Sequence, residues 1–270
     1  MLIEIFIILF DLLISTLITG LFVPVGHNYH YWVPFLLLIG GYFLGLGITW
    51  IILTMFALPF NKDKEYEKPN RFAEFLLKES VTYINKHARI KLKQVNSISL
   101  PKERYLIVCN HLSKFDPMLM AQLYGMDDLA FISKPTNFKI PLGGHFMKAS
   151  CYLAIDRYDK LKSLEVMKKA SELIIEDKAS IGVFPEGKRS EDGKLGPFHE
   201  GVFSIAIKAN CPIVISSIKG TENIHSNFPK RKTVEEFEIL DILYPNQYQG
   251  MIAKEISDYS RDLILKSLGE

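Results

Sequence analysis

Residues 105–124 read YLIVCNHLSKFDPMLMAQLY. The first five residues form a short apolar run, which predicts a buried strand over 105–109. A polar segment, 110–116, follows, and Pro117 then opens a helical pattern that continues to residue 124. A buried strand that leads through a short loop into a helix is the repeating unit of an α/β domain.

The same alternation continues along the chain. Further apolar runs occupy 129–133, 151–155, 180–184, 212–218 and 234–243, and helical patterns occupy 161–176, 200–209 and 250–268. In the last helix we expect Ile252, Ile256, Tyr259 and Leu263 to share the buried face. The pattern predicts a layered α/β domain with a mixed, largely parallel sheet flanked by helices.

The chain has 270 residues and a net charge of +2, but its charges are unevenly distributed. Residues 1–60 contain no Lys or Arg and only two acids, Glu4 and Asp11, so all 32 basic residues and 28 acids lie in the rest. The apolar stretches 1–23 and 32–58 are each long enough to cross a bilayer. We therefore predict a membrane-anchoring helical hairpin over 1–60 and one further domain over 61–270.

The distribution of basic residues predicts the orientation of this hairpin. The intervening loop, 24–31, has no Lys or Arg, whereas Lys62, Lys64, Lys68 and Arg71 follow the second stretch. The positive-inside tendency then places the domain over 61–270 on the cytoplasmic side. A cleaved signal peptide is the alternative for the first stretch, but it lacks a basic start and a small-residue cleavage site.

Small residues predict how the two hairpin helices pack. Gly41 and Gly45 are spaced G-x-x-x-G, and Thr16 and Gly20 have the same spacing. Asp11 would be costly within a span, so we expect it to face the partner helix or to be protonated.

Residues 71–87 carry apolar side chains at helical spacing. Phe72, Phe75, Leu76, Tyr83 and Ile84 alternate there with charged residues, which predicts an amphipathic helix. Two positions for it remain open: on a bilayer surface, or packed on the core of its own domain.

Polar segments follow three of the predicted strands, where α/β sheets collect their functional loops. The first segment contains His111 and Asp116. A histidine is the commonest general base near neutral pH, and a carboxylate that holds its other ring nitrogen improves it. Asp116 followed by Pro117 also fits a helix start, so both interpretations remain open. No further His, Cys or carboxylate stands at metal-ligand spacing near the pair, and we predict no metal site.

The second and third segments supply candidate anion ligands. Asp156 and Arg157 follow the run CYLAI, and FPEGKRS occupies 184–190. Gly187 permits a turn that other residues resist, and the guanidinium of Arg189 suits phosphate. Glu186 is a candidate to orient that arginine or to accept a substrate hydroxyl. A solvated turn with ion pairs is the alternative, and Lys134 and Lys139 add positive charge after another strand.

The three cysteines, Cys109, Cys151 and Cys211, all lie in or beside apolar runs. Their number is odd and their spacing does not suit a metal, which indicates reduced, buried thiols. Cys109 shares a strand face with His111, so a thiol nucleophile is conceivable there. Packing is the interpretation that we favour for it.

Taken together, these blocks resemble the lysophosphatidic acid acyltransferase family, the 1-acylglycerol-3-phosphate acyltransferases. Asn110, His111 and Asp116 match its N-H-x-x-x-x-D block, and CYLAIDR resembles the second block. FPEGKRS matches F-P-E-G-T-R-S except that Lys188 replaces threonine. Pro212 begins a fourth block, and the resemblance covers roughly 100–225. The departures at Lys188 and in CPIVISS concern the expected acceptor pocket.

The resemblance implies a glycerolphosphate acyltransferase-like fold and transfer of an acyl group from acyl-CoA or acyl carrier protein to the sn-2 hydroxyl of lysophosphatidic acid. His111 would be the base and Asp116 its orienting partner. The substrate-binding candidates are Asn110, Lys134, Arg157, Glu186, Gly187, Lys188 and Arg189. No cofactor is implied, and the implied partners are the acceptor lipid, the acyl donor and the bilayer, with no nucleic acid.

Three alternatives remain open from the sequence. The first is a related acyltransferase that uses another lysolipid, glycerol 3-phosphate or an amino-acid-linked lipid. The second is a catalytically silent, lipid-binding membrane adaptor. The third is a hydrolase that passes the acyl group to water.

Overall fold

The computed structural model describes residues 2–22, 32–61, 63–96, 98–124, 126–190 and 193–270. The predicted loop at 24–31 and the basic residue Lys62 lie outside these residues. The chain divides into two compact units, Met1–Phe60 and Asn61–Glu270, and each is described by itself.

The first unit contains two packed helices, α1 (Leu2–Phe22) and α2 (Trp32–Ala57). Gly41 and Gly45 of α2 are buried against α1, because a Cβ atom on Gly41 would lie 2.7 Å from Ser15 Cα. A Cβ on Gly45 would lie 2.5 Å from Asp11 Oδ1. Asp11 is buried at this contact, as predicted, and glycines let the two backbones approach closely.

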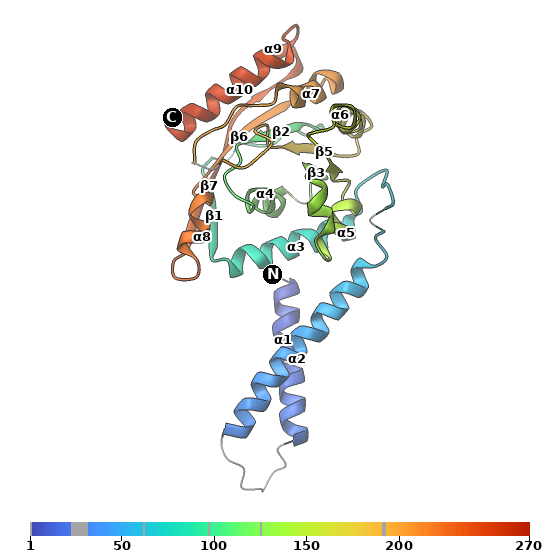
Figure 1. Cartoon of the computed structure of the whole chain (residues 1–270), viewed down its shortest axis with the longest axis vertical. Helices are drawn as coiled ribbons and strands as arrows, with labels where there is room; N and C mark the ends of the chain where they lie inside the picture. Colours follow the sequence, from blue (N-terminus) through green and yellow to red (C-terminus); the bar gives the residue numbers. More distant parts are fainter. Residues whose placement is uncertain (1, 23–31, 62, 97, 125, 191–192) are drawn as a thin grey trace. The chain divides into compact units, whose positions relative to one another are not determined.

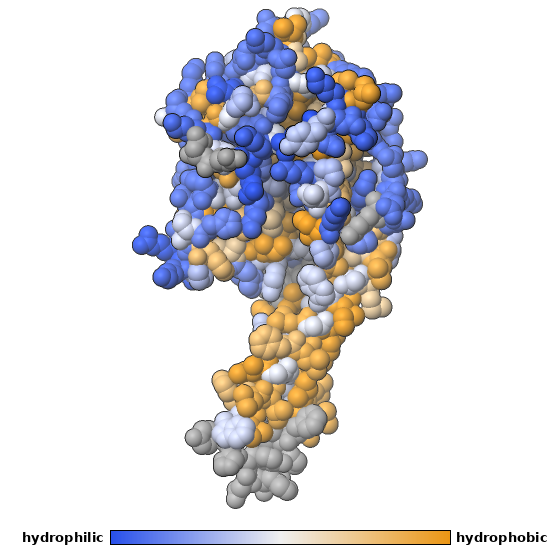
Figure 2. Space-filling model, in the orientation of Figure 1, coloured by the Kyte–Doolittle hydropathy of each residue, from blue (hydrophilic) through white to orange (hydrophobic). Residues whose placement is uncertain are grey.

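The second predicted small-residue pair does not form this contact. Thr16 and Gly20 are both exposed, and the Thr16 hydroxyl donates to the Leu12 carbonyl of its own helix. The small residue of α1 that contacts Gly41 is instead Ser15. Within the described residues, α2 has the length and composition to cross a membrane, whereas the apolar part of α1, Ile5–Leu21, is shorter. Figure 2 shows the nearly continuous hydrophobic surface of these helices.

The second unit is built on a sheet that has seven strands in the described residues, ordered β1-β7-β6-β2-β5-β3-β4 (Figure 1). The strands are β1 (Ile90–Gln94), β2 (Leu106–Cys109), β3 (Leu129–Ser133), β4 (Leu153–Ala154), β5 (Ser180–Val183), β6 (Ile213–Lys219) and β7 (Thr233–Leu243). Adjacent strands run parallel except for β6 and β7. The predicted mixed, largely parallel sheet is confirmed.

Helices cover both faces of this sheet (Figure 1). The α-helices are α3 (Arg71–His87), α4 (Asp116–Tyr124), α5 (Gly143–Ala149), α6 (Lys160–Ile175), α7 (Ser204–Ala209), α8 (Ile224–Asn227), α9 (Pro245–Tyr248) and α10 (Ala253–Leu268). The 3₁₀ turns are η1 (Pro135–Lys139), η2 (Glu200–Phe203) and η3 (Thr221–Asn223). Helix α3 packs on α4 and α5, which favours the second predicted position for this amphipathic segment.

The central strands form the core and align the loops that carry the polar residues. Every residue of β2 and β5 is buried. Gly182 of β5 is required because a Cβ there would lie 2.4 Å from the ring of Phe131 on β3. Because β2, β5, β3 and β4 are consecutive and parallel, their carboxyl ends meet at one edge of the sheet.

Candidate active site

His111 and Asp116 form a direct pair at the carboxyl end of β2. His111 Nδ1 lies 2.8 Å from Asp116 Oδ2, and the same oxygen accepts the backbone N–H groups of Leu112 and Ser113 at 2.7 Å each. Asp116 is fully buried, whereas the side chain of His111 is 17% exposed. Since an ionised carboxylate only accepts hydrogen bonds, Nδ1 carries the proton and Nε2 presents a lone pair.

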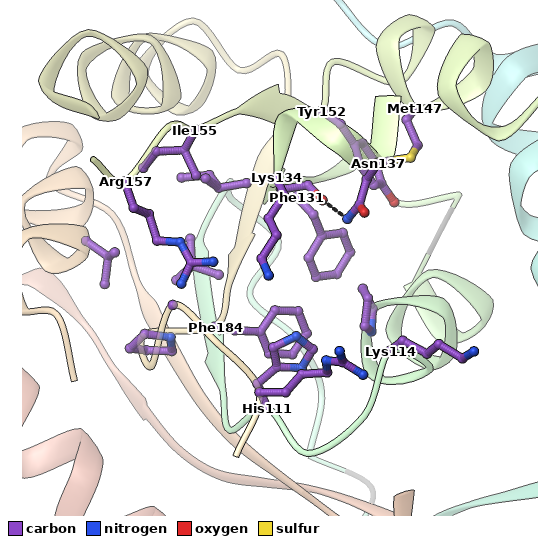
Figure 3. Close-up of a pocket in the computed structure, with 18 of the residues that line it drawn as sticks. His111, Lys114, Phe131, Lys134, Asn137, Met147, Tyr152, Ile155, Arg157 and Phe184 are labelled. Atoms are coloured by element: carbon purple, nitrogen blue, oxygen red, sulfur yellow. Dashed lines mark hydrogen bonds between the residues drawn. The ribbon is translucent and has the colours of Figure 1, made fainter. Parts of the chain in front are cut away.

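The ring of His111 lies on a hydrophobic support. Phe184, which follows β5, stacks on it with ring centroids 4.4 Å apart. Phe131 of β3 stacks in turn on Phe184 at 6.0 Å. Figure 3 shows this column of rings at the wall of the cavity. The packing and the Asp116 bond together fix the orientation of the imidazole.

Glu186 joins the loop after β2 to the loop after β5. Its Oε1 accepts the backbone N–H of His111 at 2.6 Å, and its Oε2 accepts that of Gly196 at 2.9 Å. Burial raises the pKa of this carboxyl group, and the two backbone bonds oppose that rise. Ser190 completes the connection by donating its backbone N–H to the carbonyl of His111 at 2.8 Å.

The imidazole borders a cavity of about 580 Å³. Its cationic wall includes Lys114, Lys134, Arg157 and Arg189, and its apolar wall includes Leu77, Val81, Met118, Phe131, Ile140 and Met147. In Figure 3, Lys134 and Arg157 extend from the ends of β3 and β4 toward Phe184 and His111. A cavity with one cationic and one long apolar part suits an anionic amphiphile.

The predicted site residues thus fall into two groups. His111, Lys134, Arg157, Gly187 and Arg189 line the cavity. The other four, Asn110, Asp116, Glu186 and Lys188, are not among the described lining residues.

Asn110 and Lys188 differ sharply in environment. The side chain of Asn110 is fully buried and bonds the backbone of Ile218 in both directions, at 2.9 and 2.8 Å. Lys188 is exposed. The two departures from the family pattern therefore lie outside the described cavity wall, because residues 211–217 do not line it either.

Gly187 is a turn residue whose backbone conformation favours glycine. Its φ is +67°, and a Cβ there would lie 2.9 Å from the His199 ring and 3.1 Å from Arg157 Nη1. Its N–H donates to the carbonyl of Phe184 at 2.9 Å. This N–H is therefore not free to bind the negatively charged oxygen of a reaction intermediate. His199 and Lys114 line the cavity although sequence reasoning missed them; the charge of Lys114 within the first block was the available signal.

Cys109 is fully buried, and burial raises the pKa of its thiol. A neutral, buried thiol is a poor nucleophile. The packing interpretation of this residue is therefore favoured by the structure.

The fold and site define an α/β domain with an oriented histidine at the edge of a cationic, partly apolar cavity. The model of the family described as Acyltransferase matches residues 84–219, and the chain belongs to this family. A structure of the 1-acyl-sn-glycerophosphate (LPA) acyltransferase PlsC from Thermotoga maritima has the same fold. Its TM-score is 0.57 at 22% identity, over 83% of this chain and 96% of that one.

Curated relatives carry similar descriptions. The chain is 38% identical over 117 residues to the chloroplastic 1-acyl-sn-glycerol-3-phosphate acyltransferase BAT2 of Brassica napus. The matched region covers 43% of this chain and 33% of that protein. It is 26% identical over 187 residues to 1-acyl-sn-glycerol-3-phosphate acyltransferase of Saccharomyces cerevisiae, covering 67% and 61%. The chain spans between a third and a half of the first curated relatives it matches.

Proposed function

We propose that this protein transfers a fatty acyl group from an acyl thioester to the sn-2 hydroxyl of lysophosphatidic acid, giving phosphatidic acid. The observation that carries the proposal is the 2.8 Å bond between His111 Nδ1 and Asp116 Oδ2 beside a cavity that Arg157 and Arg189 also line. The names of the curated relatives support the same acceptor and product.

In this reaction His111 is the general base. Its Nε2 removes the proton from the acceptor hydroxyl while the oxygen attacks the thioester carbonyl, and Asp116 stabilises the imidazolium that forms. The tetrahedral intermediate then expels the thiolate, which takes the proton from the imidazolium. Base catalysis of this kind contributes roughly 10²–10⁴-fold. The proposal uses no covalent enzyme intermediate, metal or cofactor, because a thioester already has a good leaving group.

The two parts of the cavity bind the two parts of the lipid. Arg157, Arg189 and Lys134 bind the phosphate, because guanidinium and ammonium groups suit its oxygens. The apolar wall takes an acyl chain. Glu186 and Asn110 hold the loops rather than contact substrate, since their polar atoms bond the backbone.

We further propose that residues 1–60 anchor the protein in a membrane with its catalytic unit on the cytoplasmic side. The long apolar helix α2 supports this. Acceptor and product are both bilayer lipids, so an anchored enzyme meets them at the interface. Acyl-CoA and acyl carrier protein both remain candidate donors.

The test is a transfer assay with the full chain reconstituted in nanodiscs. Lysophosphatidic acid, other lysolipids and glycerol 3-phosphate are each offered with acyl-CoA and with acyl carrier protein. Preferential formation of phosphatidic acid supports the proposal. A strong preference for another acceptor contradicts the substrate, and thioester cleavage that needs no acceptor would indicate a hydrolase. Transfer to no acceptor at all would favour the silent adaptor.

A further inference from the structure

Strand β7 carries a fully buried carboxyl group, that of Glu235. On β7, Thr233, Glu235, Phe237 and Ile239 alternate inward and are all buried. The ring of Phe237 packs against Tyr124 of α4 with centroids 5.8 Å apart, so this face of β7 looks toward α4. Glu235 therefore places an acid where neighbouring positions are apolar or carry a hydroxyl.

Backbone pairing connects the part of β7 that carries Glu235 to the loop that follows β2. Asn110, which precedes His111, bonds Ile218 of β6, and Ile218 pairs with Phe237 of β7. Two residues further on, a Cβ on Gly220 would lie 3.6 Å from Glu235 Cα. Helix α4 begins at Asp116 and covers the same face of the sheet (Figure 1).

The hydrogen bonds in this region are incomplete on one side of Asp116. Its Oδ2 accepts three bonds, but its Oδ1 has no protein partner among the described residues. Within the residues that the structure describes, both oxygens of Glu235 and the hydroxyl of Thr221 are also buried without a hydrogen-bond partner. Unpartnered carboxylates are strongly disfavoured in a buried site, whereas a neutral acid can donate a hydrogen bond.

The electrostatics agree with a neutral group. Burial, together with the negative charges of Asp116 and Glu222, raises the pKa of Glu235 to about 8. Glu222 is exposed, whereas Asp116 is buried. When two carboxyl groups share a buried region, one of them keeps its proton.

We propose that Glu235 is a positioning residue for the catalytic pair: it stays protonated at neutral pH and donates a hydrogen bond toward Asp116 Oδ1, directly or through water. Asp116 then remains ionised, with Oδ2 turned to His111. This inference rests on the proposed function only for its kinetic part, since the protonation of Glu235 and the titration of His111 are measurable without turnover.

The direct test is difference infrared spectroscopy of the full chain in nanodiscs at pH 7. The wild type minus Glu235→Gln difference spectrum should contain the carbonyl band of a protonated acid, whereas the same difference for the matched control Glu222→Gln should lack it. Absence of the difference band would overturn the proposal.

The second test separates positioning from packing by comparing Glu235→Gln with Glu235→Leu. Glutamine still donates a hydrogen bond, so kcat should stay within about threefold and the NMR titration midpoint of the His111 ring should not move. Leucine removes the donor. We then expect kcat to fall about tenfold with little change in acceptor KM, and the His111 midpoint to rise because Asp116 attracts the imidazolium more strongly.

Opposite outcomes contradict the proposal clearly. A lower His111 midpoint in Glu235→Gln would mean that a negative charge had been removed, so that Glu235 was ionised. A folded Glu235→Leu protein with unchanged kcat and midpoint would show that Glu235 does not position the pair. If the wild type transferred no acyl group, the proposed function would fail, while the infrared and NMR results would still decide the role of Glu235.

Discussion

His111 is the residue on which the proposed chemistry depends, and its substitution is the sharpest test at this scale. Its ring is held by Phe184 on one face and by Asp116 at Nδ1. We expect His111→Ala to lower kcat by at least about 10³-fold, within the range for loss of a general base, and to leave folding intact. Circular dichroism controls for folding, and near-normal transfer would refute the assignment.

Arg189 and Lys188 are adjacent and both exposed, but only Arg189 is among the residues that line the cavity. We expect Arg189→Ala to raise the KM for lysophosphatidic acid by about tenfold or more, because a charge-assisted bond to phosphate is lost. Lys188→Ala should leave both constants within about twofold. A fall in kcat alone for Arg189→Ala would instead place the arginine at the transition state.

Glu186 provides a test of whether a residue touches substrate or holds another residue. Its oxygens accept the N–H groups of His111 and Gly196. Glu186→Gln keeps only acceptor capacity at one position and presents an NH₂ group to a backbone N–H, so we expect kcat to fall by about 10–100-fold. The acceptor KM should stay within about twofold. A KM increase comparable to that of Arg189→Ala would show direct contact with the acceptor.

At the scale of elements, the sequence predicted best where strands are buried on both sides. The runs that became β2, β3, β5 and β6 are continuous and apolar. Such runs can be recognised as buried strands without knowing which elements pack against them. The edge strand β1 was missed because its sequence, IKLKQ, includes charged residues that an edge position leaves exposed. Strand β4 is shorter than predicted, since only Leu153 and Ala154 pair with β3.

Helix α10 shows why the facing of a helix is harder to predict. Its buried residues are Ile256, Ser257, Ser260 and Ile264, whereas Ile252 and Tyr259 are exposed. The predicted apolar stripe was therefore only partly right. Serines permit close packing once their hydroxyls bond their own helix, as Ser260 does to the Ile256 carbonyl at 2.8 Å.

In the candidate site, too, local sequence predicted some features, whereas others depend on how distant segments pack. Motif spacing identified the residues around His111. It could not show that Glu186 accepts the His111 backbone N–H, or that Glu235 lies on the face of β7 that contacts α4. Such contacts depend on strand order, which local patterns do not specify. His199 likewise reaches the cavity only because its loop returns to bond Pro185.

Helix α3 contains a pH-sensitive contact with the loop before β3. Glu74 is buried, lies 3.4 Å from Arg71 Nη1, and shares that arginine with Asp128. Burial, together with the charge of Asp128, raises the pKa of Glu74 to about 7, although Arg71 opposes the rise. The folded state therefore retains a proton that the unfolded chain loses above its ordinary value of 4.5. This contribution to stability is complete below that pH and is lost as pH rises through 7.

We therefore expect Glu74→Gln to melt at the same temperature as the wild type at pH 4.5 and at a higher temperature at pH 8. At pH 8 the free energy of unfolding should increase by about 1–2 kcal/mol, after allowance for solvent screening and for the lost Arg71 contact. Glu103→Gln, an exposed acid in the same unit, is the control. Calorimetry of the solubilised chain at both pH values provides the measurement. A variant that is less stable at pH 8 would show that the ion pair outweighs desolvation.

At the scale of the whole molecule, the helical hairpin and the α/β unit present different surfaces. Large apolar side chains are exposed along both α1 and α2, whereas the visible surface of the second unit is mostly hydrophilic (Figure 2). A hydrophobic surface that extensive marks a membrane or protein interaction site. The proposed catalytic residues all belong to the second unit, so the role that we propose for the hairpin is location rather than chemistry.

The glycines of α2 allow the hairpin to be altered without touching the catalytic unit. A Cβ on Gly45 would lie 2.5 Å from Asp11 Oδ1 and 3.0 Å from its Cα, whereas a Cβ on Gly47 has no described heavy atom within 4 Å. We expect Gly45→Leu to separate the helices, measured in nanodiscs by the distance between spin labels at the exposed positions Leu13 and Leu44. Gly47→Leu, on the same helix and equally apolar, should preserve the wild-type distance. Equal distances in all three proteins would show that close packing at Gly45 is not what holds the hairpin together.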